Sequence, residues 1–202
     1  ASGWARDELN ALARRAPEVV CVPDALMKEL SGLESPAPLG FLVELPAAAA
    51  PRPGVRTVVL DRLQDPGNVG SVLRSASALG FGQVVALKGT VALWSPKVLR
   101  AGMGAHFGLA LVEGAAPGDL AALGVPVVGT HLRDAVPLHE APLPDPLAWV
   151  FGHEGQGLSD AVAAACDLRV RIAQPGGEES LNVAAAAAIC LHETVRRGLA
   201  DQ

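Results

Sequence analysis

Residues 61–80 read DRLQDPGNVGSVLRSASALG, and the rest of the chain is organised around this stretch. The preceding run, 55–60, is apolar and rich in β-branched residues, which is typical of a buried parallel strand. Residues 65–67 predict a turn. A helix should follow, because apolar side chains recur at helical spacing at Val69, Val72, Leu73, Ala76 and Leu79. We expect Asn68 to cap this helix and Gly80 to end it.

Arg74 lies off the apolar face, so the helix does not need this residue for its core. A strand, then a turn with asparagine and glycine, then a helix carrying an off-core arginine together favour an anion site. The alternative is that Arg74 is a solvated surface residue and that Asn68 is only a helix cap. These residues alone leave both interpretations open.

The composition limits the class of protein. The chain has 202 residues, 50% of them hydrophobic, which is enough for one full core and a small appendage. The three cysteines are far apart and form no C-x-x-C pair. We therefore expect a reducing cytoplasm and no disulfide framework. The five histidines lack metal-ligand spacing, and no apolar run reaches membrane-spanning length. We therefore expect neither a metal site nor a membrane segment.

Charge is distributed unevenly along the chain. The formal net charge is −5, which by itself argues against a nucleic-acid partner. Residues 52–100, however, carry 7 basic and 2 acidic groups, a net charge of +5, whereas the segments on either side are acidic. A polyanion responds to such a local positive field whatever the total charge. We expect this segment, including Arg52 and Arg56, to contact phosphates, with chance segregation of charge as the alternative.

From residue 55 onward, short apolar strands alternate with helices. Strands are predicted at 56–60, 83–87, 107–112, 126–130, 148–152 and 168–172. Helices are predicted at 69–79, 96–102, 118–123, 159–165 and 183–197. This alternation predicts an α/β fold, a mostly parallel sheet with helices on both faces. A ligand should then lie at the carboxyl ends of the strands.

The first 45 residues predict a unit smaller than the main domain. Two short helices, at 5–15 and 24–30, alternate with two predicted strands, at 19–22 and 39–45. These elements are too few for an independent core, and we interpret them as the remainder of a small α/β domain. Residues 46–53, with three prolines and four alanines, predict a linker to the main domain, 54–202.

Two further loops follow predicted strands and carry unusual residues. Residues 152–159 read GHEGQGLS, in which three glycines allow close backbone approach and Glu154 stands at a strand end. Residues 173–182 end in SLN, where Asn182 can cap the final helix. The alternatives are a glycine-rich turn capped by Ser159 and an ordinary capped terminal helix.

Taken together, NVGSVLR (68–74), GHEGQGLS (152–159) and SLNV (180–183) resemble the three motifs of the SpoU, or TrmH-like, group of SPOUT RNA methyltransferases. The resemblance covers about residues 50–202, and the motifs stand in the family's order. It implies transfer of a methyl group from S-adenosylmethionine to a ribose 2′-hydroxyl, with ribosomal RNA favoured over tRNA. It also implies a homodimer, a deep C-terminal trefoil knot and an N-terminal remnant of a substrate-binding domain.

The resemblance also assigns residues by position. Polar catalytic-site positions match Asn68, Arg74, Glu154, Ser180 and Asn182. Cofactor positions, which act largely through the backbone, match Thr130, Gly152, Ile172 and Leu181. The third motif departs from the family at its start, where 172–174 read IAQ in place of Ile-Pro-Met, and Gly102 replaces a residue that is often serine.

Other functions remain open at this point. A base methyltransferase of the same superfamily would share the cofactor loops, and a non-catalytic RNA-binding module would explain the altered third motif. A nucleotide-binding oxidoreductase is disfavoured, because no glycine fingerprint follows a strand.

Overall fold

The chain forms two compact units that separate between Leu45 and Pro46. The computed structural model describes residues 6–47, 49–132, 134–176 and 180–200. The first unit contains helices α1 (Arg6–Ala13) and α2 (Asp24–Ser31). No described helix is long and apolar enough to cross a membrane.

The two strands predicted in the first unit, at 19–22 and 39–45, are wrong. Both runs are extended but pair with no other strand in the described part of this unit, and Val20 and Phe41 are 72% and 67% exposed. A strand needs a neighbour to bond its backbone groups, and β-branched sequence alone does not supply one. The described residues of the first unit are therefore helical and irregular, and a role in substrate binding stays a prediction.

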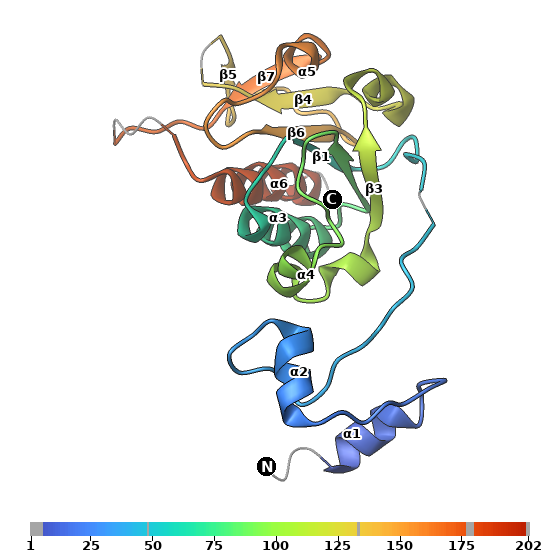
Figure 1. Cartoon of the computed structure of the whole chain (residues 1–202). Coiled ribbons are helices and arrows are strands. Elements are labelled where there is room, and N and C mark those ends of the chain that lie inside the picture. Colours follow the sequence, from blue (N-terminus) through green and yellow to red (C-terminus); the bar gives the residue numbers. More distant parts are fainter. Residues whose placement is uncertain (1–5, 48, 133, 177–179, 201–202) are drawn as a thin grey trace. The chain divides into compact units, whose positions relative to one another are not determined.

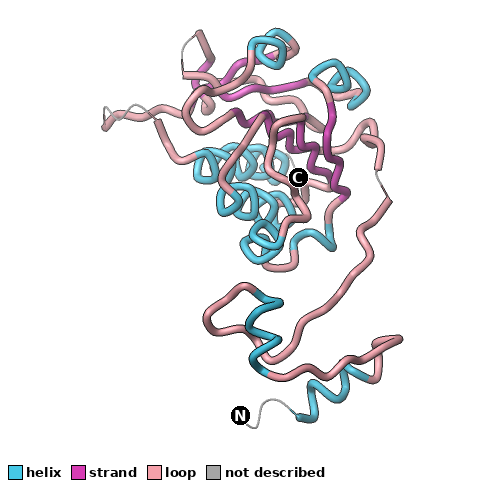
Figure 2. Tube along the Cα trace, in the orientation of Figure 1, coloured by secondary structure: helices cyan, strands magenta, loops and turns pink. Residues whose placement is uncertain are grey.

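The second unit is built on a parallel sheet, as predicted. Its described strands are β1 (Thr57–Asp61), β2 (Gln83–Leu87), β3 (Ala110–Ala115), β4 (Val127–Thr130), β5 (Val136–Pro137), β6 (Ala148–Gly152) and β7 (Leu168–Arg171). They lie in the order β3-β2-β1-β6-β4-β7-β5, and each described pair is parallel (Figures 1 and 2). The two-residue β5 was not predicted, because so short a segment has no periodicity.

Helices cover both faces of the sheet, because alternate residues of each central strand point to opposite sides. Helices α3 (Pro66–Ala78), α4 (Pro96–Gly102) and α6 (Val183–Ala200) pack together on one face, over Leu60 and Phe151 (Figure 1). The other face, over Val59 and Val150, is covered by α5 (Asp160–Ala164) and the 3₁₀ helix η2 (Pro117–Leu123). A second 3₁₀ helix, η1 (Ala105–Gly108), occupies part of the range predicted for the third strand.

The last helix is fixed to the centre of the sheet by a buried polar contact. The indole Nε1 of Trp149 in β6 donates to Thr194 Oγ1 at 2.9 Å, and both residues are buried. Because the strands are parallel, their carboxyl ends lie along one edge of the sheet. The loops that follow β1, β6, β4 and β7, and with them all three motifs, are therefore brought to neighbouring positions.

Candidate functional site

The helix after β1 is capped by Asp65 and not by Asn68, so that prediction is wrong. Asp65 Oδ1 accepts from the backbone N–H of Asn68 at 2.7 Å, and Pro66 occupies the first helical position, where its missing N–H costs nothing. Asn68 is thus inside the first turn of α3. Because Asn68 does not cap the helix, its side-chain amide can form hydrogen bonds with other parts of the fold.

A chain of hydrogen bonds joins all three motifs through that amide. Asn182 caps α6 as predicted, because its Oδ1 accepts from the N–H groups of Ala184 and Ala185 at 2.9 and 3.3 Å. Its Nδ2 then donates to Asn68 Oδ1 at 2.9 Å, and Asn68 Nδ2 donates to Glu154 Oε1 at 3.2 Å.

The orientation of these amides follows from the helix terminus. Since the N–H groups of α6 can only donate, the oxygen of Asn182 must face them and its NH₂ must face Asn68. The oxygen of Asn68 is thereby occupied, so its own NH₂ requires an acceptor. A carboxylate oxygen of Glu154 supplies this acceptor.

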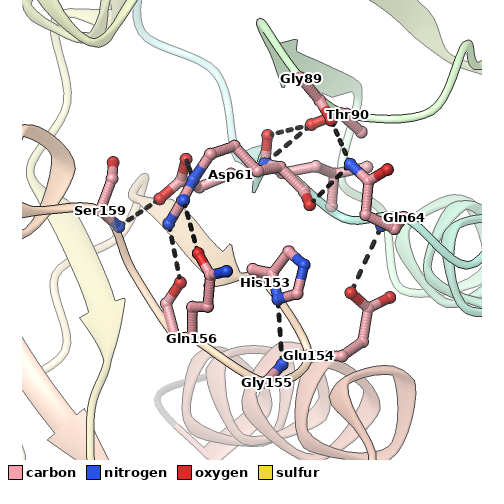
Figure 3. Close-up of polar contacts among 12 residues, drawn as sticks. Asp61, Gln64, Gly89, Thr90, His153, Glu154, Gly155, Gln156 and Ser159 are labelled. Carbon is pink, nitrogen blue, oxygen red and sulfur yellow. Dashed lines mark hydrogen bonds and ion pairs between the residues drawn. The ribbon is translucent and has the colours of Figure 1, made fainter.

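Glu154 also holds the loop between β1 and α3. Its Oε2 accepts from the N–H of Gln64 at 3.3 Å (Figure 3), and its Oε1 accepts from the N–H of Asp65 at 3.2 Å. Desolvation raises the pKa of this carboxyl, but hydrogen bonds from its own backbone, Asn68, Asp65 and Gln64 outweigh it and leave the pKa below its ordinary 4.5. The charged form is the one that the site holds.

Glu154→Gln should therefore lower the melting temperature at neutral pH, because an amide cannot accept from all three donors. A carboxyl whose pKa is lowered on folding contributes stability above its unfolded pKa and loses it as pH falls through the folded pKa. The melting temperatures of the wild type and of Glu154→Gln should accordingly converge as the pH is lowered from about 7 to below about 4. A difference that stays constant over this range would contradict the assigned role of the charge.

Arg74 and Ser180 lie outside this hydrogen-bonded chain. Arg74 is exposed on α3, about 9 Å along the helix axis from Asn68. Among the described residues, no hydrogen bond or ion pair occupies its guanidinium. Ser180 is exposed two residues before Asn182. Both side chains are thus available to a ligand, and Arg74 is confirmed to lie off the core.

The predicted cofactor residues follow adjacent strands. Thr130 and Gly152 end β4 and β6, which pair with each other, and Ile172 directly follows β7, which pairs with β4. The fourth, Leu181, is 40% exposed before α6. A groove of about 530 Å³, within the usual range for small-molecule sites, borders Ile172 but not the other three. Three of the four predicted cofactor positions therefore lie at the carboxyl ends of adjacent strands, and only Ile172 borders the groove.

Gly152 is required by the protein's own backbone. A Cβ atom at this position would lie 2.3 Å from the carbonyl carbon of Gly157 and 2.4 Å from the nitrogen of Leu158. The bare Cα thus lets the 153–158 loop fold back over the strand end. The expectation that Gly152 makes room beside a ligand is not tested by this contact, and a substitution here would displace the loop first.

Two of the basic residues expected to contact phosphates face elsewhere. Arg56 pairs with Asp145 through two hydrogen bonds, and Arg52 Nη2 donates to the carbonyl of Gly82. Arg56 directly precedes β1, and Gly82 directly precedes β2, so both contacts lie at the amino ends of these strands, the edge opposite to the motifs. Other positively charged residues of this segment, among them Arg74, Lys97 and Arg100, are exposed.

Sequence reasoning missed Asp61, Arg62 and Gln64, which link β1 to the second motif. Their signal was a run of polar residues directly after a buried strand. In the described residues no cluster of His, Cys, Asp and Glu could hold a metal ion. The site therefore combines a hydrogen-bonded polar frame with an exposed arginine further along the same helix, which has no partner among the described residues, and this combination suits positioning and charge stabilisation.

The fold is that of a family of RNA-modifying enzymes. The chain belongs to the SpoU rRNA Methylase family, whose model matches residues 56–192. This confirms the resemblance seen in the three motifs.

Particular relatives are similar over most of the chain. It is 33% identical, over its whole length and 74% of the relative, to a 23S rRNA (uridine(2479)-2′-O)-methyltransferase of Streptomyces viridochromogenes. It is 38% identical to a 23S rRNA (guanosine(2553)-2′-O)-methyltransferase of Bacillus subtilis over 68% of this chain, which is 56% of that enzyme's length. A solved SpoU methyltransferase, AviRb of S. viridochromogenes in complex with AdoMet, has a TM-score of 0.68 and 32% identity, covering 74% of this chain and 62% of that one.

Proposed function

We propose that this protein methylates a ribose 2′-hydroxyl of ribosomal RNA, with S-adenosylmethionine as the methyl donor. The observation that carries the proposal is the chain Asn182–Asn68–Glu154, which joins the three family motifs at the start of α3, the helix that also carries the exposed Arg74. Family membership and relatives named as 23S rRNA 2′-O-methyltransferases support the same reaction. An rRNA substrate implies the cytoplasm as the compartment.

The cofactor, when bound, supplies a methyl group on a positively charged sulfur. Thr130, Gly152, Ile172 and Leu181 hold it, largely through backbone groups at the strand ends. Because the electrophile is already strong, the protein's task is to align the ribose oxygen and to accommodate one proton. Positioning of this kind can contribute roughly 7–11 kcal/mol to lowering the barrier.

Arg74 is the residue that acts on the RNA. Its planar fork can bind the phosphate next to the target ribose through two parallel hydrogen bonds and stabilise charge developing on the oxygen. An arginine remains protonated at neutral pH, so we assign it this electrostatic role and not that of a general base. Asn68, Ser180, Asn182 and Glu154 orient the ribose and the loops around it.

We also propose the C-terminal knot. In the sheet order β1-β6-β4-β7, the last helix returns from β7 to pack on α3 and β6, across strands formed earlier in the chain. This return is compatible with threading through an earlier loop. Pulling the two ends of one molecule should then leave a contour shorter than that of 202 extended residues. A full extension would contradict the knot.

The homodimer is proposed to form through the outer face of α6. Ile189 is 41% exposed and lines the groove with Ala188, His192 and Ile172. Burying a charge against an apolar partner surface is costly. Ile189→Glu should therefore convert a particle of twice 20.6 kDa into a monomer, as measured by sedimentation. Leu199→Glu, at an exposed site on the same helix outside the groove, is the matched control. A monomeric wild type at micromolar concentration would refute the proposal.

The function is tested by mapping 2′-O-methyl groups in total RNA from cells with and without the gene. One position in ribosomal RNA should lose its methyl group when the gene is deleted. An unchanged map, together with failure of the pure protein to bind S-adenosylhomocysteine, would instead favour a non-catalytic RNA-binding role.

A further inference from the structure

Arg62, directly after β1, has an unusual backbone. Its φ is +63°, in the left-handed region that side-chain-bearing residues rarely adopt. Its N–H donates to Thr90 Oγ1 at 3.0 Å, and the Thr90 hydroxyl donates to the carbonyl of Leu60 at 2.9 Å (Figure 3). The surrounding structure thus holds Arg62 in a backbone conformation that costs free energy.

The guanidinium of Arg62 reaches across to the second motif. Its Nε donates to Asp61 Oδ1 at 3.2 Å, its Nη1 to Gln156 Oε1 at 3.0 Å and its Nη2 to the carbonyl of Gly157 at 3.5 Å (Figure 3). Asp61 is only 2% exposed, and its other oxygen accepts from the N–H of Ser159 at 2.6 Å. One arginine and one buried carboxylate therefore hold the far side of the 153–158 loop.

The space for this side chain is provided by Gly89. A Cβ atom on Gly89 would lie 3.2 Å from Arg62 Cγ, and the φ of Gly89 is +92°. Its carbonyl accepts from Gln64 Nε2, so the loop after β2 supports the same region. The reach of Arg62 thus depends on a second loop as well as on its own backbone.

The 153–158 loop is consequently held from two sides. Glu154 attaches its near side to Gln64 and Asp65, and Arg62 attaches its far side at Gln156 and Gly157. The loop contains two glycines, and glycine loses more conformational freedom on ordering than any other residue. Without these contacts, the free-energy cost of ordering the loop would fall on ligand binding.

We propose that Arg62 is a positioning residue that orders the 153–158 loop before the cofactor binds. The inference rests on the proposed function, since it assigns this loop to the cofactor site. Arg62 needs no contact with the cofactor; it acts through Gln156, Gly157 and Asp61. Its strained backbone is the cost of aiming a guanidinium where a residue with ordinary φ could not place one.

Arg62→Gly separates this role from a general structural one. Glycine adopts the same φ without strain, and this relief offsets part of the loss of the side-chain contacts, so the melting temperature should stay within a few degrees of wild type. Because glycine lacks the guanidinium, the contacts with Gln156 and Gly157 are lost, and calorimetry should show S-adenosylhomocysteine binding weakened by about tenfold or more. In the cofactor-free protein, the amides of residues 155–157 should exchange hydrogen faster.

Met103→Gly is the matched control, because Met103 also has a positive φ, 48°, but its backbone N–H donates to Arg100 at the end of α4 and forms no hydrogen bond with this loop among the described residues. It should relieve the same kind of strain and leave the affinity unchanged. Gln156→Ala should weaken binding, and combining it with Arg62→Gly should add little, because the two side chains form one contact.

The outcomes distinguish this inference from the function on which it rests. A wild type that binds no S-adenosylhomocysteine would remove the proposed function itself. A wild type that binds, beside an Arg62→Gly variant with equal affinity and equal exchange at 155–157, would overturn the role of Arg62 alone. Weak binding that merely accompanies unfolding of the variant would also contradict it.

Discussion

Methyl transfer is expected to fall by about 100- to 1,000-fold when Arg74 is replaced by alanine, as happens when a single group that stabilises transition-state charge is removed. The melting temperature should change by only a few degrees, because Arg74 is exposed and no described residue bonds to its guanidinium. Binding of S-adenosylhomocysteine should persist, since the cofactor loops follow other strands. Single-turnover assays, melting curves and calorimetry measure these three quantities.

Two variants sharpen this prediction. Arg74→Lys should not restore activity, because a point charge cannot replace a planar fork with two parallel donors. Arg14→Ala removes an equally exposed arginine from the first unit and should leave the chemical step unaffected. Full activity in Arg74→Ala would remove the residue on which the proposed mechanism depends.

An RNA that carries one 2′-deoxy sugar at the mapped position should accept no methyl group from the wild-type protein. The reason is that the attacking oxygen is missing while the bases and phosphates are unchanged. The matching all-ribose RNA should yield a product that resists alkaline cleavage at that position, because cleavage needs the free 2′-hydroxyl. Tritium transfer from labelled S-adenosylmethionine, followed by alkaline hydrolysis, measures both. Methylation of the deoxy substrate would mean that a base is the acceptor.

Much of the sheet could be predicted because its strands are buried on both faces. Such strands read as continuous apolar runs, and the ranges predicted at 83–87 and 148–152 match β2 and β6 residue for residue. The same reasoning failed at 19–22 and 39–45, where the apolar runs have no partner strand among the residues that the structure describes. A strand is a property of two segments, and only one of them is visible in a local pattern.

In the site, too, features that depend on neighbouring residues could be predicted, and features that depend on distant segments could not. The cap at Asn182 was predictable, because capping depends on a residue and the few that follow it. The cap at Asn68 was assigned wrongly, because Asp65 with Pro66 starts the helix three residues earlier. The positive φ of Arg62 and its reach to Gln156 could not be predicted, since they arise only when two loops meet in the folded protein.

The bond between Asn68 and Asn182 spans 114 residues of sequence, and that between Asn68 and Glu154 spans 86. During synthesis, the first motif is therefore made long before its partners. The side-chain amide of Asn68 on α3 can bond only to water until Glu154 and Asn182 have been made. Contacts of such separation form slowly, because the chain between them must first be ordered. A chain that has not yet made α6 thus lacks one member of this hydrogen-bonded group, which is complete only when that eighteen-residue helix docks.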